Sequence, residues 1–580
     1  MKKVINFLKS KKDIILKFVV SFLSYVGVSI YIKLPFYNIA SLILLFVILK
    51  LYFNYNKKID KKIKKYCIIL SIIFSLFLSV GNIVYDNITI TDIGFLNLKN
   101  CIYITLMFIG LFPLLYKLFN FIFLNLNKIK IIDKNPKMNF KLFVIIFIII
   151  LFLWLILFLR FFPAIISPDS YYVVNNVENK ILSDHHTFGH TWFFAFFYKI
   201  GKALFSTING GVAFYTVFQM IIMALIFAFA IRYFYNKGLK KSICIIMAIF
   251  IGLNPLYSRY SVTLWRDVLF GMSFIVLFLT LYDYISNDFK IKKTNVILFT
   301  IFTIIMLFFR NNGIYVFLFM MPFIIFIGKK HKIKKGIYCI LIILSYFIIK
   351  GPVFEHFKVE KGKMSEAYSI PIQQISRVVA SDKEIKVKDY KFLTKLYDVK
   401  NAKENYDPVI SDRMKETIDN GYLDENKPQF FKTWFSILIQ HPSLYFEAYF
   451  TQTLGYWYPD VKYWATCGEG ESFFDPEFRT EPLLPSKVNK VIDLTIARPI
   501  PFAILIWSIG TYFALLITAT FISIYKFGKQ HILYYIPFYG LWFTMLIASP
   551  VFAELRYVFG LFACMPFILL TPFMNKKLTK

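Results

Sequence analysis

Residues 140–162 read FKLFVIIFIIILFLWLILFLRFF, and residues 163–192 continue as PAIISPDSYYVVNNVENKILSDHHTFGHTW. A helix needs about 20 mainly apolar residues to cross the roughly 30 Å hydrocarbon core of a bilayer. The first segment meets this need, because its two charged residues, Lys141 and Arg160, lie near its ends. The sequence therefore predicts a membrane-spanning helix that opens into a polar loop with two aspartates and three histidines.

The rest of the chain repeats this pattern of apolar blocks and polar loops. Hydrophobic residues make up 58% of the 580 residues, above the roughly 45–50% of soluble globular proteins. The fold class that we expect is an all-α polytopic membrane protein. We predict fourteen spans, at about 13–33, 36–54, 66–85, 101–123, 140–162, 212–234, 242–257, 268–285, 295–309, 313–328, 337–350, 500–526, 531–549 and 556–573.

The formal net charge of +33 comes from short lysine clusters between the blocks, not from one basic stripe, so we do not expect nucleic-acid binding. Alternate loops carry 33 lysines, and the short loops between them hold about nine lysines and arginines. Lysine-rich loops stay on the cytoplasmic side of a membrane. We therefore expect a multi-pass protein of the plasma membrane with both termini in the cytoplasm. The lysine-rich segments are 1–12, 56–65, 117–141, 235–241, 286–294, 329–335, 526–530 and 575–580.

The loops divide the chain into four predicted parts. Residues 1–134 form a four-helix membrane module, and residues 135–350 form a transmembrane core with a functional first external loop at 163–211. Residues 351–498 have the composition of a soluble protein and lie on the external side, so we predict an inserted, mostly helical extracytoplasmic domain of ordinary size. Residues 499–580 form a C-terminal three-helix membrane segment.

Two aromatic segments bear on how these parts meet. Residues 430–464 read FFKTWFSILIQHPSLYFEAYFTQTLGYWYPDVKYW, which favours a helix along the membrane surface; the alternative is the core of the external domain. Residues 191–205 favour a second interfacial helix. The six cysteines are scattered without a CxxC pair, which argues against a disulfide framework or a zinc site.

Unusual polar residues gather at the predicted external ends of several spans. A charged side chain costs about 2.5–3.5 kcal/mol in the middle of a membrane and less near its surface. Charged residues in such places usually face a cavity, a partner or a substrate. The residues are Asp169, Asp184, His185, His186, Arg259, Arg266, Asp267, Arg310, Asn311, Asn312, Glu554 and Arg556.

Asp169 is a candidate general base or metal ligand. A carboxylate becomes a better base at neutral pH when burial raises its pKa. The alternative interpretation is structural, because Ser-Pro-Asp-Ser is a common turn sequence. His185 and His186 are candidates for substrate orientation or metal binding, although adjacent histidines on a helix point about 100° apart. Together with Asp184 they are also suited to capping the helix that contains Thr191.

Arg266 and Asp267 form either an ion pair with each other at a helix start or part of a site. In the segment Arg310-Asn311-Asn312-Gly313, a tight turn explains the asparagines and the glycine but not an arginine at the end of an apolar run. Arginine is suited to bidentate contact with phosphate.

Glu554 and Arg556 are two residues apart, so we expect them on different sides of a helix. Ion pairing and extension of the arginine toward the membrane surface are the simpler explanations. One of the arginines is a candidate phosphate ligand.

The strings SPDSYY, SDHHT, LWRDVLF, FRNNG, GYWYPD and AELRY, at residues 167–172, 183–187, 264–270, 309–313, 455–460 and 553–557, together resemble an uncharacterised bacterial family allied to the GT-C superfamily of membrane glycosyltransferases. The order of features is also similar: an aspartate at the end of a span, an interfacial helix, further spans, a late external domain and Glu-x-Arg-Tyr. The resemblance covers about residues 140–573. The chain departs from it in lacking an acidic pair in the first loop and in its four additional N-terminal spans.

The resemblance implies a GT-C-like core and an inverting transfer of sugar from a polyprenyl-phosphate donor to a cell-envelope acceptor on the external side. It implies that Asp169 is the base and that Arg310, Arg266 or Arg556 stabilises the departing lipid phosphate. Asp267 or Glu554 would stabilise the cationic sugar ring. His185, His186, Asn311 and Asn312 would contact the substrate. The partners are the bilayer, the lipid-linked sugar and the acceptor. The resemblance implies no definite cofactor beyond the donor substrate, and a divalent metal is left open.

A transporter or flippase of a lipid-linked saccharide is the alternative function, since the same arginines would hold its phosphate groups. Transporters usually bind their substrate near the middle of the membrane, on broken helices in repeated halves. The polar residues here gather at one surface and no internal repeat is visible, which favours an enzyme. A purely structural role leaves the one-sided charges unexplained.

Overall fold

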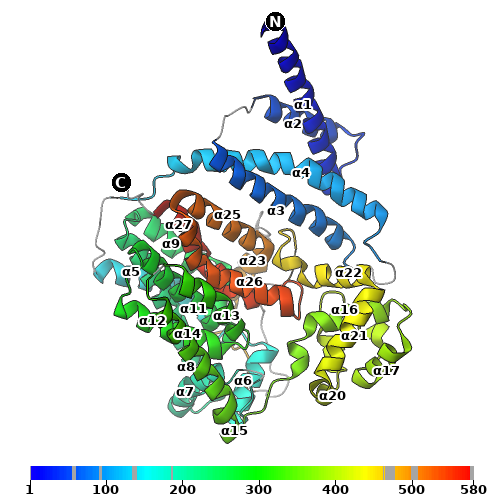
Figure 1. Ribbon diagram of the computed structural model, residues 1–580. Helices are drawn as coiled ribbons and strands as arrows, with labels where there is room; N and C mark the ends of the chain where they lie inside the picture. The colour runs from blue at the N-terminus through cyan, green and yellow to red at the C-terminus, as the bar shows by residue number, and fades with distance from the viewer. Residues whose placement is uncertain are drawn as a thin grey trace.

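The computed structural model describes residues 2–54, 60–89, 94–133, 140–184, 187–328, 330–461, 463, 477–497 and 507–574. Helices make up 78% of the structure. Among the described residues, β-structure is limited to isolated bridges. The predicted all-α class is confirmed. In Figure 1 the N-terminal helices lie above a compact group of helices, and the inserted helices α16–α22 lie to one side.

The helices are grouped here by the predicted parts of the chain. The N-terminal module contains α1 (Lys2–Tyr31), α2 (Ile39–Asn54), α3 (Lys61–Asp86), α4 (Leu98–Asn125) and η1 (Leu126–Lys128). The next part contains α5 (Phe140–Arg160), α6 (Pro168–Glu178), α7 (Phe188–Phe205), α8 (Ile208–Asn236), α9 (Lys241–Leu253), α10 (Pro255–Ser261), α11 (Arg266–Ser286), α12 (Lys293–Phe309), α13 (Gly313–Phe326) and α14 (Lys332–Ile348).

The inserted segment begins with a π-helical turn that continues α14, and the last three long helices follow it. The insert contains η2 (Ile349–Val353), α15 (Phe354–His356), η3 (Met364–Glu366), α16 (Ser369–Ala380), α17 (Val387–Leu396), α18 (Ala402–Asn405), α19 (Asp412–Glu416), α20 (Asn420–Glu425), α21 (Lys427–Gln440), α22 (Pro442–Thr453), η4 (Leu454–Tyr456) and α23 (Ser486–Ala497). The C-terminal part contains α25 (Ile509–Phe527), η5 (Lys529–Tyr535), α26 (Ile536–Ala548), η6 (Leu555–Val558) and α27 (Phe559–Met574).

Ten helical segments are long and apolar enough to cross a membrane, which identifies a multi-pass membrane protein. An eleventh span results if α9 and α10 are counted together, although they are bent by 62° at Asn254 and Pro255. The helices α2, α12 and α13 are apolar but have only 16, 17 and 14 residues. At 1.5 Å per residue, each is shorter than the roughly 30 Å hydrocarbon core.

The central helix of the protein is α11. In its most apolar window 94% of the residues are buried, which is typical of a helix that is surrounded by others. It packs against α8, α12, α27 and η5, and one continuous hydrophobic core joins these helices to α5, α9, α13, α25 and α26. The C-terminal helices are therefore part of the same core as the helices that precede the insert.

A contact between two glycines brings the ends of α11 and α27 together. A Cβ atom on Gly271 would lie 3.0 Å from the Gly560 nitrogen, and one on Gly560 would lie 3.2 Å from the Gly271 oxygen. Small residues allow such a close approach of two membrane helices. Asp267 and Arg556 each lie four residues before one of these glycines, so the contact places both charged residues at the same end of the helix pair.

The inserted segment has a hydrophobic core of its own, built mainly from α16, α17, α21 and α22. A buried ion pair closes this core. Arg377 Nη2 lies 3.0 Å from Glu447 Oε2, and the two side chains are 2% and 1% exposed. The other oxygen of Glu447 accepts a hydrogen bond of 2.8 Å from the Leu96 backbone nitrogen, which ties the insert to the N-terminal module.

The insert also holds the loop between α26 and η6. The Tyr456 hydroxyl donates to the Val551 carbonyl at 3.0 Å and accepts from the Glu554 backbone nitrogen at 3.2 Å. Next to it, the Gly455 nitrogen donates to the Phe552 carbonyl at 2.9 Å. The position of Glu554 therefore depends on the insert.

The aromatic segment has both buried and exposed side chains. It forms α21 and α22, which are separated at His441 and Pro442. Phe430 and Ile437 are buried in the core of the insert, whereas Phe435 and Ile439 are exposed. The predicted second interfacial helix is α7, with Trp192 and other large apolar side chains exposed along it. The position of both helices relative to a membrane stays a prediction.

Candidate functional site

Asp169 lies in the first turn of α6. Ser167 and Ser170 form a reciprocal capping box at the start of this helix, so SPDS begins a helix instead of forming an isolated turn. The Trp265 indole nitrogen donates to the Ser167 hydroxyl at 2.7 Å, and the Ser170 hydroxyl donates to the Leu264 carbonyl at 3.0 Å. These bonds fix Asp169 against the segment just before α11.

Asp169 is ion-paired with Arg556, a residue 387 positions away in the sequence. The Asp169 side chain is 33% exposed, so it remains accessible. Arg556 Nε also lies 3.4 Å from Glu554 Oε1. The prediction that Glu554 and Arg556 point to different sides of a helix was wrong, because Glu554 has an extended backbone and precedes the short helix η6.

Asp267 forms the second carboxylate–arginine pair. Arg310 Nη1 lies 2.5 Å from Asp267 Oδ1, and the side chains are 12% and 2% exposed. Asp267 thus pairs with a residue from the α12–α13 connection. Arg266 begins α11 and is half-buried.

Tyr557 joins the two pairs. The Arg310 guanidinium carbon lies 4.3 Å from the centre of the Tyr557 ring, and that of Arg556 lies 5.2 Å from it. Both distances are in the range of cation–π interactions. Sequence reasoning did not single out Tyr557, although it stands inside the quoted string AELRY. We call the group Asp169, Asp267, Arg310, Glu554, Arg556 and Tyr557 the charged cluster.

Three other predicted residues lie near the charged cluster but have structural contacts. The Lys350 amino group lies 2.5 Å from Asp184 Oδ1 and 2.8 Å from Asn311 Oδ1, and the Asn311 amide donates to the Asp184 carbonyl at 3.1 Å. The Asn312 amide donates to the Thr544 hydroxyl at 3.3 Å. Sequence reasoning missed Lys350, which lies in the π-helical turn η2, a kind of distortion that is frequent at functional sites.

Two predicted positions lie outside the described residues, His185 and His186. The third histidine of the loop, His190, is buried in α7, and its ring nitrogen Nε2 lies 3.0 Å from the Tyr215 hydroxyl. Helix α7 begins at Phe188, and its N-cap residue Thr187 forms no side-chain cap. The Asp184 carboxylate contacts Lys350 instead.

The sequence matches the family of unknown function DUF6020 over residues 154–580. The chain belongs to the DUF6020 family. No curated protein and no solved structure matches it. The DUF6020 match contains every residue of the charged cluster and the whole insert, whereas the predicted N-terminal module lies before it.

The carboxylates of this DUF6020 protein do not form a ready metal site in the part of the chain that the structure describes. Asp169 and Asp267 are each paired with an arginine, and no group of three or more His, Cys, Asp and Glu residues is arranged to hold a metal ion there.

Glu554 lies between two candidate spans and is only 2% exposed. Burial raises the pKa of its carboxyl group to about 8, even though Arg556 and Arg310 act in the opposite direction. Desolvation disfavours the charged form of a carboxylate, so Glu554 holds its proton at neutral pH. The charged cluster consequently contains two carboxylates paired with arginines and, at Glu554, a third carboxyl group whose pKa is raised by burial.

This protonation predicts how the stability of the protein depends on pH. The folded protein keeps the Glu554 proton up to about pH 8, whereas an unfolded chain releases it near pH 4.5. The corresponding stabilisation, on the order of 3–5 kcal/mol, is complete below pH 4.5 and is lost as the pH rises to 8. In Glu554→Gln this pH dependence should be absent.

Thermal unfolding of the purified full chain in detergent, from pH 5 to 8.5, measures this effect. The unfolding temperature of the wild type should fall relative to that of Glu554→Gln as the pH rises. Parallel curves for the two proteins would contradict the assignment. Glu404→Gln, at an exposed position of α18, serves as the control and should show the pH dependence of the wild type.

Proposed function

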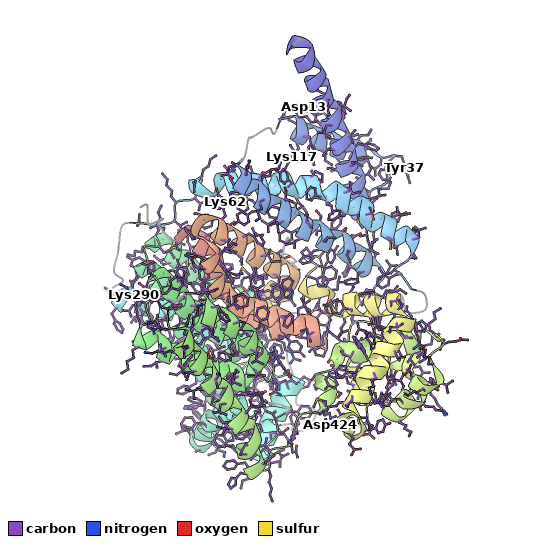
Figure 2. The ribbon with its side chains drawn as sticks, in the orientation of Figure 1. Asp13, Tyr37, Lys62, Lys117, Lys290 and Asp424 are labelled. Carbon is purple, nitrogen blue, oxygen red and sulfur yellow. The ribbon has the colours of Figure 1, made fainter. Side chains whose placement is uncertain are left out.

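We propose that this protein is a GT-C-like glycosyltransferase that moves a sugar from a polyprenyl-phosphate donor to a cell-envelope acceptor. In this proposal all fourteen apolar segments are spans, both termini are cytoplasmic, and the charged cluster faces the external side of the plasma membrane. The lysine pattern supports this orientation, since Lys62 and Lys290 lie on one side of the molecule and Asp424 lies on the other (Figure 2).

The observation that carries the proposal is the charged cluster itself. Four segments far apart in the sequence contribute three carboxylates and two arginines around one tyrosine. Two half-buried arginines are suited to a lipid phosphate, because a guanidinium stays charged and can make two parallel bonds to it. Carboxylates beside them are suited to proton transfer and to a cationic sugar ring.

The reaction is a single displacement with inversion. The acceptor oxygen forms a bond to the anomeric carbon of the sugar, while the bond from that carbon to the phosphate oxygen breaks and its electron pair remains on the lipid phosphate. The hydroxyl proton of the acceptor passes to the Asp169 carboxylate. Arg556 and Arg310 stabilise the charge on the departing phosphate.

The pairing of Asp169 with Arg556 gives the donor a second role. The lipid phosphate competes for Arg556, and Asp169 loses part of the positive charge beside it. A carboxylate without a neighbouring cation binds a proton more strongly. Donor binding therefore makes Asp169 a stronger base at the moment when the acceptor must be deprotonated.

Transfer from radiolabelled polyprenyl-phosphate sugars by membranes that contain the wild-type protein tests the proposal. Membranes with the double variant Asp169→Asn, Arg556→Ala, at equal expression, provide the blank. Label in an envelope fraction that depends on the intact charged cluster supports a transferase. Equal label in both membranes, with each of several hexose and pentose donors, would contradict it.

Arg556→Lys is a milder test of the same site. Lysine keeps the charge but cannot make the bidentate contact or stack on Tyr557 in the same way, so transfer should fall about 10- to 100-fold. The rate of transfer at saturating donor measures the effect. Arg479→Lys is the matched control, because Arg479 is 60% exposed and its pair with Glu481 lies on the surface. A wild-type rate of transfer in Arg556→Lys would show that Arg556 does not bind the donor phosphate through a bidentate contact.

The second candidate function is transport of a lipid-linked saccharide, which the bend between α9 and α10 favours. Broken helices commonly form the binding sites of transporters. The bend of 62° places the short helix α10, with the buried Arg259, beside α5 and α8. If wild-type membranes transfer no sugar but move labelled lipid-linked saccharide across vesicles in an Arg259-dependent way, this second function replaces the first.

A further inference from the structure

A cavity of about 250 Å³ lies between α11, α12, α13 and α14. It is lined by Thr280, Leu281 and Tyr284 near the C-terminal end of α11, whereas Asp267 lies at the other end of that helix. Fourteen residues separate Asp267 from Leu281, a rise of about 21 Å along a helix. The cavity is therefore distinct from the charged cluster and lies toward the lysine-rich loops.

Four lysines surround this cavity: Lys290, Lys292, Lys334 and Lys335. One of them is neutralised, because the Lys292 amino group lies 2.8 Å from Asp283, an acid that Lys237 also contacts at 3.2 Å. Lys290 and Lys334 are exposed, and no acid among the described residues lies within ion-pair distance of either. The mouth of the cavity thus has an excess of positive charge.

Lys335 differs from the other three because it is buried. Its amino group donates to the carbonyls of Ile327 and Gly328, at 2.9 and 3.1 Å, just beyond the end of α13. These carbonyls fix the ammonium group at the wall of the cavity. An ammonium group has three N–H donors, so the two backbone bonds leave it one further donor.

The remaining wall is apolar, with Leu281, Val296, Phe299 and Ile324 among its side chains. These side chains make the space beside the lysines suited to a hydrocarbon chain.

We propose that this cavity binds an anionic diacyl phospholipid from the leaflet on the side of the lysine-rich loops. Its phosphate lies between Lys290, Lys334 and Lys335, and one acyl chain enters the cavity. Basic pockets between transmembrane helices on this side of a membrane are suited to acidic lipid head groups. The charge excess selects an anionic lipid, and the apolar wall selects a lipid over a free anion. This site is independent of the proposed transferase function.

The test uses the purified full chain in a neutral detergent and native mass spectrometry to count bound lipid. Dioctanoyl phosphatidylglycerol is the anionic probe, dioctanoyl phosphatidylcholine the zwitterionic one, and inorganic phosphate the free anion. Lys290→Gln, Lys334→Gln removes two charges at the mouth. Lys64→Gln, Lys65→Gln is the matched control, because it removes two exposed lysines of α3 on a different lysine-rich segment.

Each lysine near an anionic lipid strengthens binding about fivefold, so the mouth variant should bind phosphatidylglycerol about 25-fold more weakly than the control variant. Val296→Trp fills the apolar wall without changing the charge and should also lose the lipid. Equal binding of the two lipids, equal binding by both lysine variants, or competition by inorganic phosphate at the lipid's own concentration would each overturn the proposal. If the mouth variant does not fold, the test rests on Val296→Trp. Lipid binding that persists in Val296→Trp would show that the cavity is not the lipid site.

Discussion

Asp169→Asn should lower the rate of sugar transfer about 10²- to 10⁴-fold. Positioned general bases contribute about this much to catalysis, and asparagine cannot accept the proton of the acceptor. The asparagine side chain has nearly the same shape, and the capping box of α6 uses Ser167 and Ser170, so the fold should persist. The reduction should appear at saturating donor, because the lost step follows binding.

Rates of transfer at matched amounts of folded protein measure this prediction. Asp424→Asn is the control, because Asp424 is an exposed residue of the insert whose surface pair with Lys427 contributes little to stability. Transfer that survives Asp169→Asn would exclude Asp169 as the base. The search would then move to Glu554, whose raised pKa also suits proton transfer, and to Asp267.

Arg377→Met should destabilise the insert by about 3–5 kcal/mol. The substitution leaves the buried carboxylate of Glu447 without its cation, and an unpaired buried charge is among the most destabilising changes in a protein. Glu447→Gln combined with Arg377→Met removes both charges and keeps an acceptor for the Leu96 nitrogen. The double variant should therefore recover part of the loss.

Pulse proteolysis of the full chain in detergent, over a series of urea concentrations, measures the stability of the insert. Arg413→Met, at an exposed position of α19 in the same segment, is the control and should behave like the wild type. If Arg377→Met unfolds at the wild-type urea concentration, the ion pair does not stabilise the insert. If the double variant is less stable than either single variant, the explanation by an unpaired charge fails.

The helical membrane character of the chain could be predicted from the sequence because apolar runs have a length that the bilayer sets. Ten helices meet the length criterion. The remaining predicted spans fall on α2, on α12 and α13, and on the α9–α10 pair. These were harder to judge, because a short or bent apolar helix looks the same in the sequence whether it crosses a membrane or packs inside a protein. Asn254-Pro255 marks the bend, since proline cannot continue the preceding helix.

The charged cluster was predictable as a set but not as pairs. The topology predicted from the spans and the lysine-rich loops placed five residues on the same side of the membrane: Asp169, Asp267, Arg310, Glu554 and Arg556. The structure places them together. The pairs Asp169–Arg556 and Asp267–Arg310 join distant segments, so no local pattern specifies them. Local reasoning left open whether Asp267 pairs with Arg266 or belongs to a site. It separated Glu554 from Arg556 because it assumed that this stretch is helical.

The hydrogen bonds between the insert and the loop before Glu554 link ligand binding at the insert to ligand binding at the charged cluster. Tyr456 and Gly455 bond to the same short loop that sets the positions of Glu554 and Arg556. A molecule that binds the insert and shifts this loop changes the affinity of the charged cluster for its own ligand by some factor. Reciprocity then requires that a ligand in the cluster changes the affinity of the insert by the same factor. An acceptor that binds the insert would therefore change the affinity of the charged cluster for the donor, through the backbone of residues 549–554.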